Sequence, residues 1–220
     1  MGRLLVVDGL DGSGKTTQIE RLDAWLTEGG HAHRLITFPD YAEPSSALVK
    51  QYLAGDFGTT AEEVSAYAAS SFYAVDRYAS YKHFWEGDYR AGALILAARY
   101  TTSNAIYQLA RTDRAEWDAF LTWLDDYEYV KLGLPRPDAV CFLDMPTDVS
   151  QRLLRERYHG DESKKDVHER DLAFLCRCRE AALYVAQRQG WRVLPCAENG
   201  EPLSREAVTA RLTEWMTPYL

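Results

Sequence analysis

One segment near the start of the chain constrains the fold more than any other. Residues 9–16 read Gly-Leu-Asp-Gly-Ser-Gly-Lys-Thr, which fits the pattern GxxxxGK[ST]. An apolar run precedes the segment and a helical pattern follows it, so the sequence predicts a phosphate-binding loop between a buried strand and a helix. The glycines let several backbone N–H groups point at one anion, and the helix adds its positive end. The chain is therefore expected to bind a nucleoside triphosphate.

Individual loop positions have expected roles. Lys15 brings a positive charge to the β and γ phosphates, and the Thr16 hydroxyl is the expected ligand of Mg²⁺. The residues predicted to bind the triphosphate are Gly9, Leu10, Asp11, Gly12, Ser13, Gly14, Lys15, Thr16 and Thr17. The loop alone fits a kinase, a GTPase or a motor. A GTPase also needs an NKxD segment to read guanine, and neither Asn104 nor Asn199 precedes a lysine, which argues against that class.

Apolar runs and helical patterns alternate along the whole chain. The predicted strands are 3–7, 33–38, 94–97, 139–143 and 191–195. The predicted helices are 16–26, 45–54, 60–85, 102–111, 115–129, 147–158, 171–189 and 204–215, with Thr60 and Glu63 as a capping box for the third. Continuous apolar strands suit a parallel sheet that is buried on both faces. We expect one α/β domain over residues 1–220, a doubly wound five-stranded parallel sheet flanked by helices.

The charge balance argues against a nucleic-acid partner. The formal net charge is -8, whereas a DNA- or RNA-binding surface needs an extended basic patch. A small phosphorylated substrate needs only a local cluster of arginine and lysine. The most apolar stretch, residues 91–98, is too short to cross a bilayer, and Asp8 interrupts the first apolar run. We therefore expect no membrane partner and no signal peptide, and we predict a cytoplasmic location.

Several further motifs follow the loop in a fixed order. They are Phe38-Pro39, Phe72 with Asp76-Arg77, the segment 99–108 (Arg-Tyr-Thr-Thr-Ser-Asn-Ala-Ile-Tyr-Gln), the segments 132–138 and 142–144, and Arg157-Tyr158 followed by the polar segment 159–165. In this order they resemble thymidylate kinase, and most closely a bacterial branch with Phe-Pro in the second motif. The resemblance covers most of the chain and is more specific than the loop. It implies the nucleoside monophosphate kinase form of the phosphate-loop fold.

The acceptor side is assigned from side-chain chemistry and from this resemblance. Arg77 and Arg99 can both hold a phosphate in bidentate fashion. Phe72 lies five residues before Arg77, about 1.4 helical turns, so a base on the ring and a phosphate on the arginine are compatible. The resemblance implies that Phe72 stacks on thymine, that Tyr107 contacts the deoxyribose, and that the base is read and enclosed by Ser103, Asn104, Gln108, Phe38 and Pro39. Taken singly, Phe72 and Tyr107 also fit a role in the core.

Phosphoryl transfer needs positive charge at the transferring group. Some thymidylate kinases carry an arginine inside the phosphate loop, whereas residues 11–13 of this chain have none. The resemblance implies a mobile lid over residues 155–168, in which Arg155 and Arg157 are the candidates. Together with Lys15, Arg99 and Asp11 they form the expected catalytic set. The two lid arginines also fit an exposed basic helix face, and that alternative stays open.

The chain departs from the family pattern at Ala98. The family has an aspartate there, which helps to hold Mg²⁺, and its loss typically costs about ten- to a thousandfold in rate. Three interpretations follow: a weakened enzyme, compensation by Asp8 or Asp11, or nucleotide binding without turnover. A second departure is Tyr41, near a position where some branches carry a phosphate-binding arginine.

The leading hypothesis is a homodimeric kinase that uses ATP and Mg²⁺ to convert dTMP to dTDP. The aromatic segment 65–85 is one candidate dimer contact, although burial in the core explains it equally well. The alternatives are another nucleotide kinase, which would differ in the acceptor pocket, and a nucleotide-binding protein with little turnover, which is motivated by Ala98.

Overall fold

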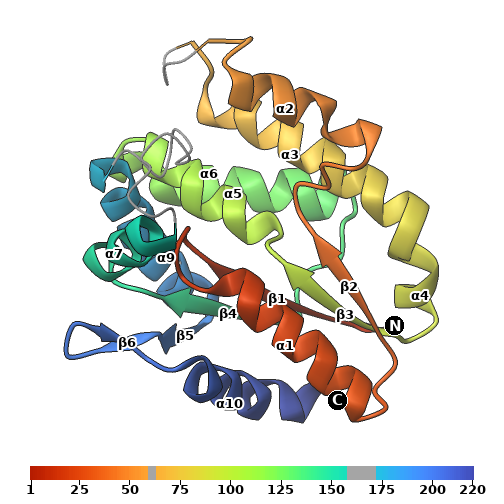
Figure 1. Ribbon diagram of the computed structural model, residues 1–220. Coiled ribbons are helices and arrows are strands. Elements are labelled where there is room, and N and C mark those ends of the chain that lie inside the picture. Colours follow the sequence, from red (N-terminus) through yellow and green to blue (C-terminus); the bar gives the residue numbers. More distant parts are fainter. Residues whose placement is uncertain (59–62, 158–171) are drawn as a thin grey trace.

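A computed structural model describes residues 1–58, 63–157 and 172–220 of the chain. Its centre is a parallel sheet of five strands in the order β2-β3-β1-β4-β5 (Figure 1). The strands are β1 (Arg3–Gly9), β2 (His33–Thr37), β3 (Leu94–Ala98), β4 (Ala139–Asp144) and β5 (Arg192–Pro195). This confirms the predicted α/β fold and all five predicted strands. A two-stranded hairpin, β6 (Ala197–Glu198) and β7 (Glu201–Pro202), was not predicted.

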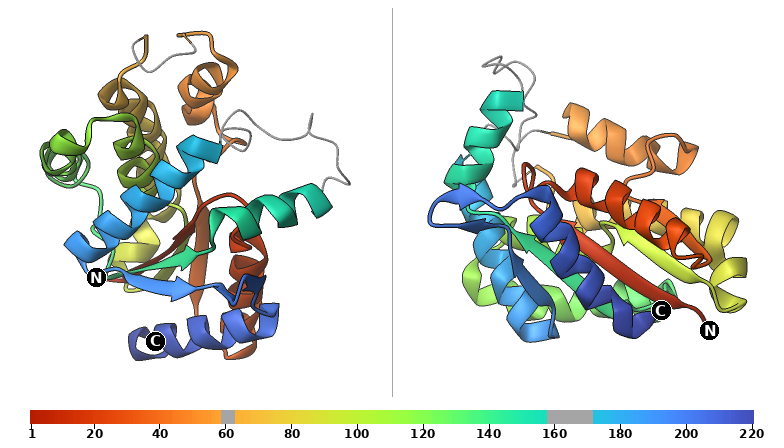
Figure 2. Two further views of the ribbon diagram at one scale, coloured as in Figure 1. Left: turned by 90° about the vertical axis from the view of Figure 1, so that its left-hand side faces the viewer. Right: turned by 60° about the horizontal axis from the view of Figure 1, so that its bottom comes forward.

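Helices cover both faces of the sheet (Figure 2). Their bounds are α1 (Lys15–Glu28), α2 (Ala47–Ala54), α3 (Ala66–Ser80), α4 (Glu86–Arg90), α5 (Thr101–Tyr107), α6 (Trp117–Asp125), α7 (Thr147–Arg157), α9 (Leu172–Gln189) and α10 (Arg205–Met216). Shorter turns include η1 (Pro44–Ser46) and two π-helical turns, η2 (Tyr81–Trp85) and η5 (Asp126–Lys131). No helix in these described ranges is long and apolar enough to span a bilayer.

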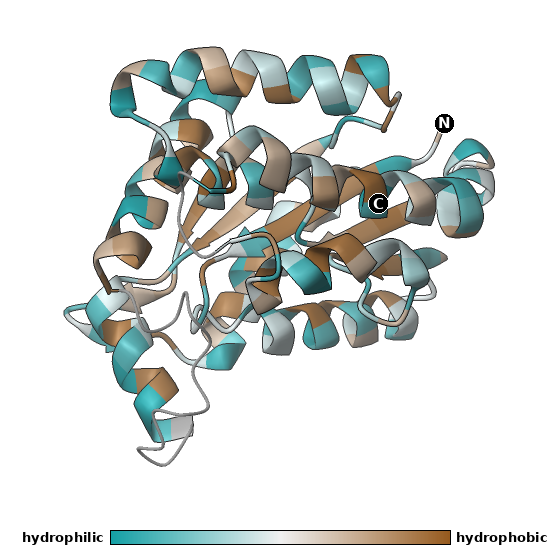
Figure 3. Ribbon diagram, turned by 90° about the horizontal axis from the view of Figure 1, so that it is seen from above, coloured by the Kyte–Doolittle hydropathy of each residue, from teal (hydrophilic) through white to brown (hydrophobic). Residues whose placement is uncertain are grey.

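Successive side chains of the central strand enter different cores. Leu5 and Val7 of β1 pack with the apolar faces of α1 and α10, whereas Leu4 and Val6 pack with the aromatic residues around Trp85. Figure 3 shows the apolar strands enclosed between helices whose outer faces are hydrophilic. Burial on both faces explains why the strands read as continuous apolar runs in the sequence.

The third predicted helix begins later than the sequence analysis placed it. Thr60 lies outside the described residues, and α3 starts at Ala66. The capping residue is Ser65, whose Oγ accepts a hydrogen bond from the backbone N–H of Ala68 at 3.2 Å. A serine accepts this bond as well as a threonine does, so composition alone did not identify the cap.

Candidate active site

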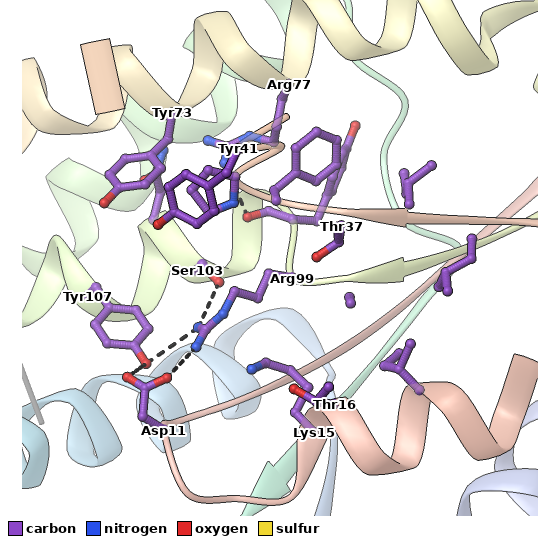
Figure 4. Close-up of a pocket in the computed structure, with 18 of the residues that line it drawn as sticks. Asp11, Lys15, Thr16, Thr37, Tyr41, Tyr73, Arg77, Arg99, Ser103 and Tyr107 are labelled. Atoms are coloured by element: carbon purple, nitrogen blue, oxygen red, sulfur yellow. Dashed lines mark hydrogen bonds and ion pairs between the residues drawn. The ribbon is translucent and has the colours of Figure 1, made fainter. Parts of the chain in front are cut away.

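A cavity of about 870 Å³ opens at the carboxyl ends of β1, β2 and β3. In a doubly wound parallel sheet this edge is where ligands bind. The lining residues come from the phosphate loop, the segment after β2, helix α3 and the β3–α5 turn. They include Asp11, Lys15, Thr16, Phe38, Pro39, Tyr41, Tyr73, Arg77, Ala98, Arg99, Ser103, Asn104, Tyr107 and Gln108. Most of the predicted site residues are thus brought to one cavity (Figure 4).

The phosphate loop adopts the conformation that its glycines predict. Gly12 and Gly14 have φ angles of 77° and 83°, which other residues rarely adopt. A Cβ atom on Gly12 would also lie 3.0 Å from Ser150 of α7, so the loop packs closely against that helix. Helix α1 begins at Lys15, directly after Gly14. The positive end of a helix therefore faces the edge of the cavity.

The remaining loop residues divide between the cavity and the core. Thr16 lies on the cavity wall and is exposed, whereas the side chain of Leu10 is buried in a core cluster that includes Phe142. Ser13 is buried, and its Oγ has no hydrogen-bond partner among the described residues. Leu10 can contribute only its backbone to a ligand, whereas Thr16 can also offer its hydroxyl.

The surroundings of the Lys15 ammonium group disfavour its charged form. The pKa of Lys15 is lowered to about 8, first by burial and then by the positive charge of Arg99. Asp8 and Asp11 act in the opposite direction but only partly offset these effects. A bound polyphosphate would supply the negative charge that this group lacks in the free protein.

Arg99 is held over the phosphate loop by several acceptors. Its Nη2 donates to Asp11 Oδ1 at 2.7 Å, and its Nη1 lies 3.6 Å from Asp8 Oδ1. Nη1 is also 3.4 Å from Ser103 Oγ and from the hydroxyl of Tyr107, which itself donates to Asp11 Oδ2 (Figure 4). The φ angle of Arg99 is 64°, an uncommon value for a residue other than glycine. This left-handed backbone follows directly after β3.

The two carboxylates near Arg99 have different surroundings. Asp8 is fully buried and accepts hydrogen bonds from the Gly9 N–H and the Thr102 and Ser103 hydroxyls, at 2.6–2.8 Å. Asp11 is half-buried and lines the cavity. Ala98, at the end of β3, also lines the cavity and presents only a methyl group. Of the two carboxylates expected to compensate for Ala98, only Asp11 reaches the space where a ligand would bind.

Of the two adjacent aromatic residues of α3, Tyr73 is the one that lines the cavity. Phe72 does not line the cavity and packs on Phe57 and Tyr52, with ring centroids 5.3 and 6.1 Å away. Tyr73 lies four residues before Arg77, and residues at this spacing share one face of a helix. A spacing of four residues before Arg77, rather than five, would have pointed to Tyr73 in the sequence.

Arg77 contacts a residue that the sequence analysis missed. Its Nε and Nη2 donate to the two carboxylate oxygens of Glu128 at 2.7 and 2.5 Å, and the two side chains are 1% and 0% exposed. Burial alone would lower the pKa of Arg77, but the charge and hydrogen bonds of Glu128 outweigh burial and raise it. The charge of Arg77 is therefore already paired within the protein, whereas Arg99 pairs with Asp11 of the phosphate loop.

Other predicted residues are packed into the walls. Phe38 is buried against the ring of Tyr100, with centroids 5.9 Å apart, and precedes a cis peptide bond to Pro39. Gln108 is buried and its Oε1 accepts from Arg111 at 2.9 Å.

The segment after β2 is attached to α3 by a carboxylate. Asp76 of α3 accepts hydrogen bonds from the Asp40 N–H and the Ser45 hydroxyl, at 3.0 and 2.6 Å. These contacts fix the chain on either side of Tyr41, which is 52% exposed and lies on the cavity wall.

The predicted lid is only partly described. Arg155 lies in α7, is exposed and does not line the cavity. Arg157 ends the same helix, and its side chain is outside the described part of the structure. Residues 158–168 of the predicted lid also lie outside the described residues.

Comparisons with known proteins agree on one family. The family model described as thymidylate kinase matches residues 7–206. The thymidylate kinase of Mycobacterium tuberculosis is 30% identical over 191 residues, covering 86% of this chain and 87% of that protein. A probable thymidylate kinase of Pyrobaculum aerophilum is 26% identical over 202 residues, covering 92% of each. The solved structure of thymidylate kinase from Candida albicans superposes with a TM-score of 0.72 at 22% identity, covering 99% of this chain and 92% of that one. This last likeness supports the fold.

The lowered pKa of Lys15 predicts how stability depends on pH. Between pH 8 and 10.5 the unfolded chain keeps the Lys15 proton that the folded chain has lost, so the free energy of unfolding gains a contribution as pH rises through this window. The substitution Lys15→Met removes this contribution. We expect wild type to gain stability relative to Lys15→Met between pH 7 and pH 10, measured by urea unfolding. A stability difference that stays constant over this range would contradict the assignment.

Proposed function

This chain belongs to the thymidylate kinase family, and we propose that it transfers the γ-phosphoryl group of ATP to the 5′-phosphate of dTMP, giving dTDP and ADP. The observation that carries the proposal is the family match over residues 7–206, whose span includes the phosphate loop and every other described element of the cavity. The family match does not favour a nucleotide-binding protein without turnover. The cytoplasm, where ATP is abundant, is the proposed location.

We assign ATP to the loop end of the cavity. The glycine-rich turn of the loop and the start of α1 suit the phosphates, and Lys15 suits the β and γ oxygens. Thr16 and Asp11 offer the hard oxygen ligands that suit Mg²⁺, and both line the cavity. When bound with the triphosphate, Mg²⁺ neutralises charge on the phosphate oxygens. Asp11 also holds Arg99, at 2.7 Å.

We assign dTMP to the space between the phosphate loop and α3. Arg99 is the arginine adjacent to the loop, so it is the proposed ligand of the acceptor phosphate. Tyr107, which contacts Arg99, is proposed to lie against the deoxyribose. The base would then lie between the ring of Tyr73 and the wall formed by Phe38 and Pro39.

The proposed mechanism relies on alignment and on charge. An acceptor phosphate is largely ionised near neutral pH, so no strong general base is required. Lys15 and Arg99 would hold the two phosphates in line, and Arg99 is prevented from swinging away by its contacts with Asp11 and Ser103. Arg155 and Arg157 remain the proposed source of further charge at the transferring group.

Substrate preference and the aromatic ring are tested in one assay. ADP release is measured with ATP and each deoxynucleoside monophosphate in turn, and we expect dTMP to be preferred. Base stacking on an aromatic side chain is worth about 1–3 kcal/mol, so Tyr73→Ala should raise the KM for dTMP about tenfold. The matched change Phe72→Ala should leave it within about threefold of wild type, because that ring lies outside the cavity. Equal effects of the two changes would refute the assignment of Tyr73.

A substitution of Ala98 by aspartate is expected to raise the activity. An aspartate at this position would line the cavity beside the phosphate loop without being fully buried. We expect Ala98→Asp to raise kcat about tenfold at saturating Mg²⁺, because a carboxylate there would add to the charge stabilisation of the metal–nucleotide complex. The control Ala98→Asn has the same shape without the charge and should give no gain. If neither variant exceeds wild type, Ala98 does not weaken the enzyme.

We also propose that the chain forms a homodimer through α3. Val75 and Tyr78 of α3 and Phe84 of η2 are 44%, 40% and 45% exposed, an apolar surface that a second copy would cover. Light scattering after size exclusion should give twice the 25.0 kDa mass of the chain for wild type and the monomer mass for Val75→Asp. Leu172→Asp, a matched charge on an exposed residue of α9, should stay dimeric. A monomeric wild type would rule the dimer out.

A further inference from the structure

A cluster of three polar side chains lies behind the cavity and comes from three separate segments. Glu128 belongs to η5, Arg77 to α3 and Asn104 to α5, and their exposed fractions are 0%, 1% and 2%. Arg77 and Asn104 line the cavity, whereas Glu128 does not and can act only through them. The cluster therefore joins a residue outside the site to two that face it.

The contacts of Asn104 fix which end of its amide faces the cavity. Its Nδ2 donates to the backbone oxygen of Ser70 at 3.1 Å and to Glu128 Oε1 at 3.0 Å. Both partners are pure acceptors, so turning the amide over would put oxygen against oxygen at two points. Both N–H bonds of the amide are used, and Oδ1 is the atom left for a ligand. Within the described part of the chain, no hydrogen bond to Oδ1 is found.

The contacts of Arg77 fix its guanidinium next to Asn104, and this group can only donate hydrogen bonds. Its Nε and Nη2 donate to Glu128, and its Nη1 donates to the backbone oxygen of Tyr100 at 3.3 Å. A guanidinium has five N–H bonds in a rigid plane, so one on each terminal nitrogen remains for the cavity. Figure 4 shows Arg77 reaching down from α3 toward the cavity. The wall thus presents a donor from Arg77 and an acceptor from Asn104.

We propose that Glu128 is a positioning residue that sets this hydrogen-bond polarity, so that the acceptor site takes a base with a ring N–H next to a carbonyl. The proposal rests on the proposed function. Thymine presents this edge: its N3–H matches Asn104 Oδ1 and its O4 matches Arg77. Cytosine presents a bare ring nitrogen and an amino group, so it would set acceptor against acceptor and donor against donor. A site that leaves buried polar groups unpaired rejects such an analogue strongly.

Glu128→Gln tests the proposal because it preserves shape and removes the two-acceptor end of the side chain. Its new NH₂ group must face either Arg77 or both Arg77 and Asn104, so at least one of the two residues must turn away. The substrate pair is dTMP and 5-methyl-dCMP, which carry the same methyl group and differ only in the edge of the base. We expect the ratio of their kcat/KM values to fall about tenfold or more in Glu128→Gln, mainly through a higher KM for dTMP. The KM for ATP and the ratio of dTMP to dUMP, which reports on the methyl group alone, should not change.

Two further variants separate positioning from folding. Glu86→Gln is the matched control, since Glu86 forms ion pairs with Lys82 and Arg90 on α4 and η2 away from the cavity, and it should leave both ratios unchanged. Glu128→Asp keeps the carboxylate, so it should retain the ratio of dTMP to 5-methyl-dCMP within about threefold even if both KM values rise. Thermal unfolding shows whether each variant is folded. If Glu128→Gln does not fold, Glu128→Asp is the test. A large fall in the ratio of the kcat/KM values for dTMP and 5-methyl-dCMP in a folded Glu128→Asp variant would overturn the proposal.

The possible failures are distinguishable. A wild-type protein that releases no ADP with dTMP would refute the proposed function itself. A wild-type protein that prefers dTMP, together with a folded Glu128→Gln variant that keeps the ratio of dTMP to 5-methyl-dCMP, would refute only the role of Glu128. A uniform loss of activity on both substrates has the same consequence, since it is the result of a purely structural role.

Discussion

The buried carboxylate of Asp8 is the interaction on which the site depends. It ends the central strand and accepts hydrogen bonds from the Gly9 N–H and from the Thr102 and Ser103 hydroxyls of α5. One oxygen also lies 3.6 Å from Nη1 of Arg99. A buried carboxylate is costly unless it is paired and hydrogen-bonded, so these partners are held in place together. Asp8 thereby fixes the phosphate loop, the β3–α5 turn and Arg99 in one arrangement.

The features that the sequence predicted are those whose signals are local. The phosphate loop and the strand before it occupy one span of 14 residues, 3–16. All five strands were predicted because burial on both faces makes each a continuous apolar run. Sequence spacing did not show which ring lines the cavity: Tyr73 does and Phe72 does not, because one residue turns a helix by about 100°. Glu128 had no local signal: 51 residues separate it from Arg77, and only the fold brings them together. The residues of the lid beyond Arg157 lie outside the described structure, so that prediction stays open.

Two arginines of the same predicted role differ because their surroundings differ. Arg77 is paired with a fully buried glutamate, and the pair carries no net charge into the cavity. The removal of either partner would leave a buried charge without compensation, which typically costs about 3–5 kcal/mol. Arg99 donates to Asp11, which is only half-buried, so an incoming phosphate can compete with Asp11 for Arg99. The burial of the paired carboxylate therefore distinguishes the two arginines. Arg77, paired with a buried carboxylate, suits hydrogen bonding to a neutral base, whereas Arg99, paired with a half-buried one, suits holding an anion.

The β3–α5 turn connects these two environments. The guanidinium of Arg99 points to the phosphate loop, while the backbone oxygen of the next residue, Tyr100, accepts from Arg77. Four residues further on, Asn104 donates to Glu128. A shift of this turn would therefore disturb the phosphate end and the base end of the cavity together. The uncommon φ of 64° at Arg99 allows adjacent residues to serve opposite ends of a cavity of about 870 Å³, and this coupling would align the phosphate of a bound monophosphate whenever its base is correctly seated.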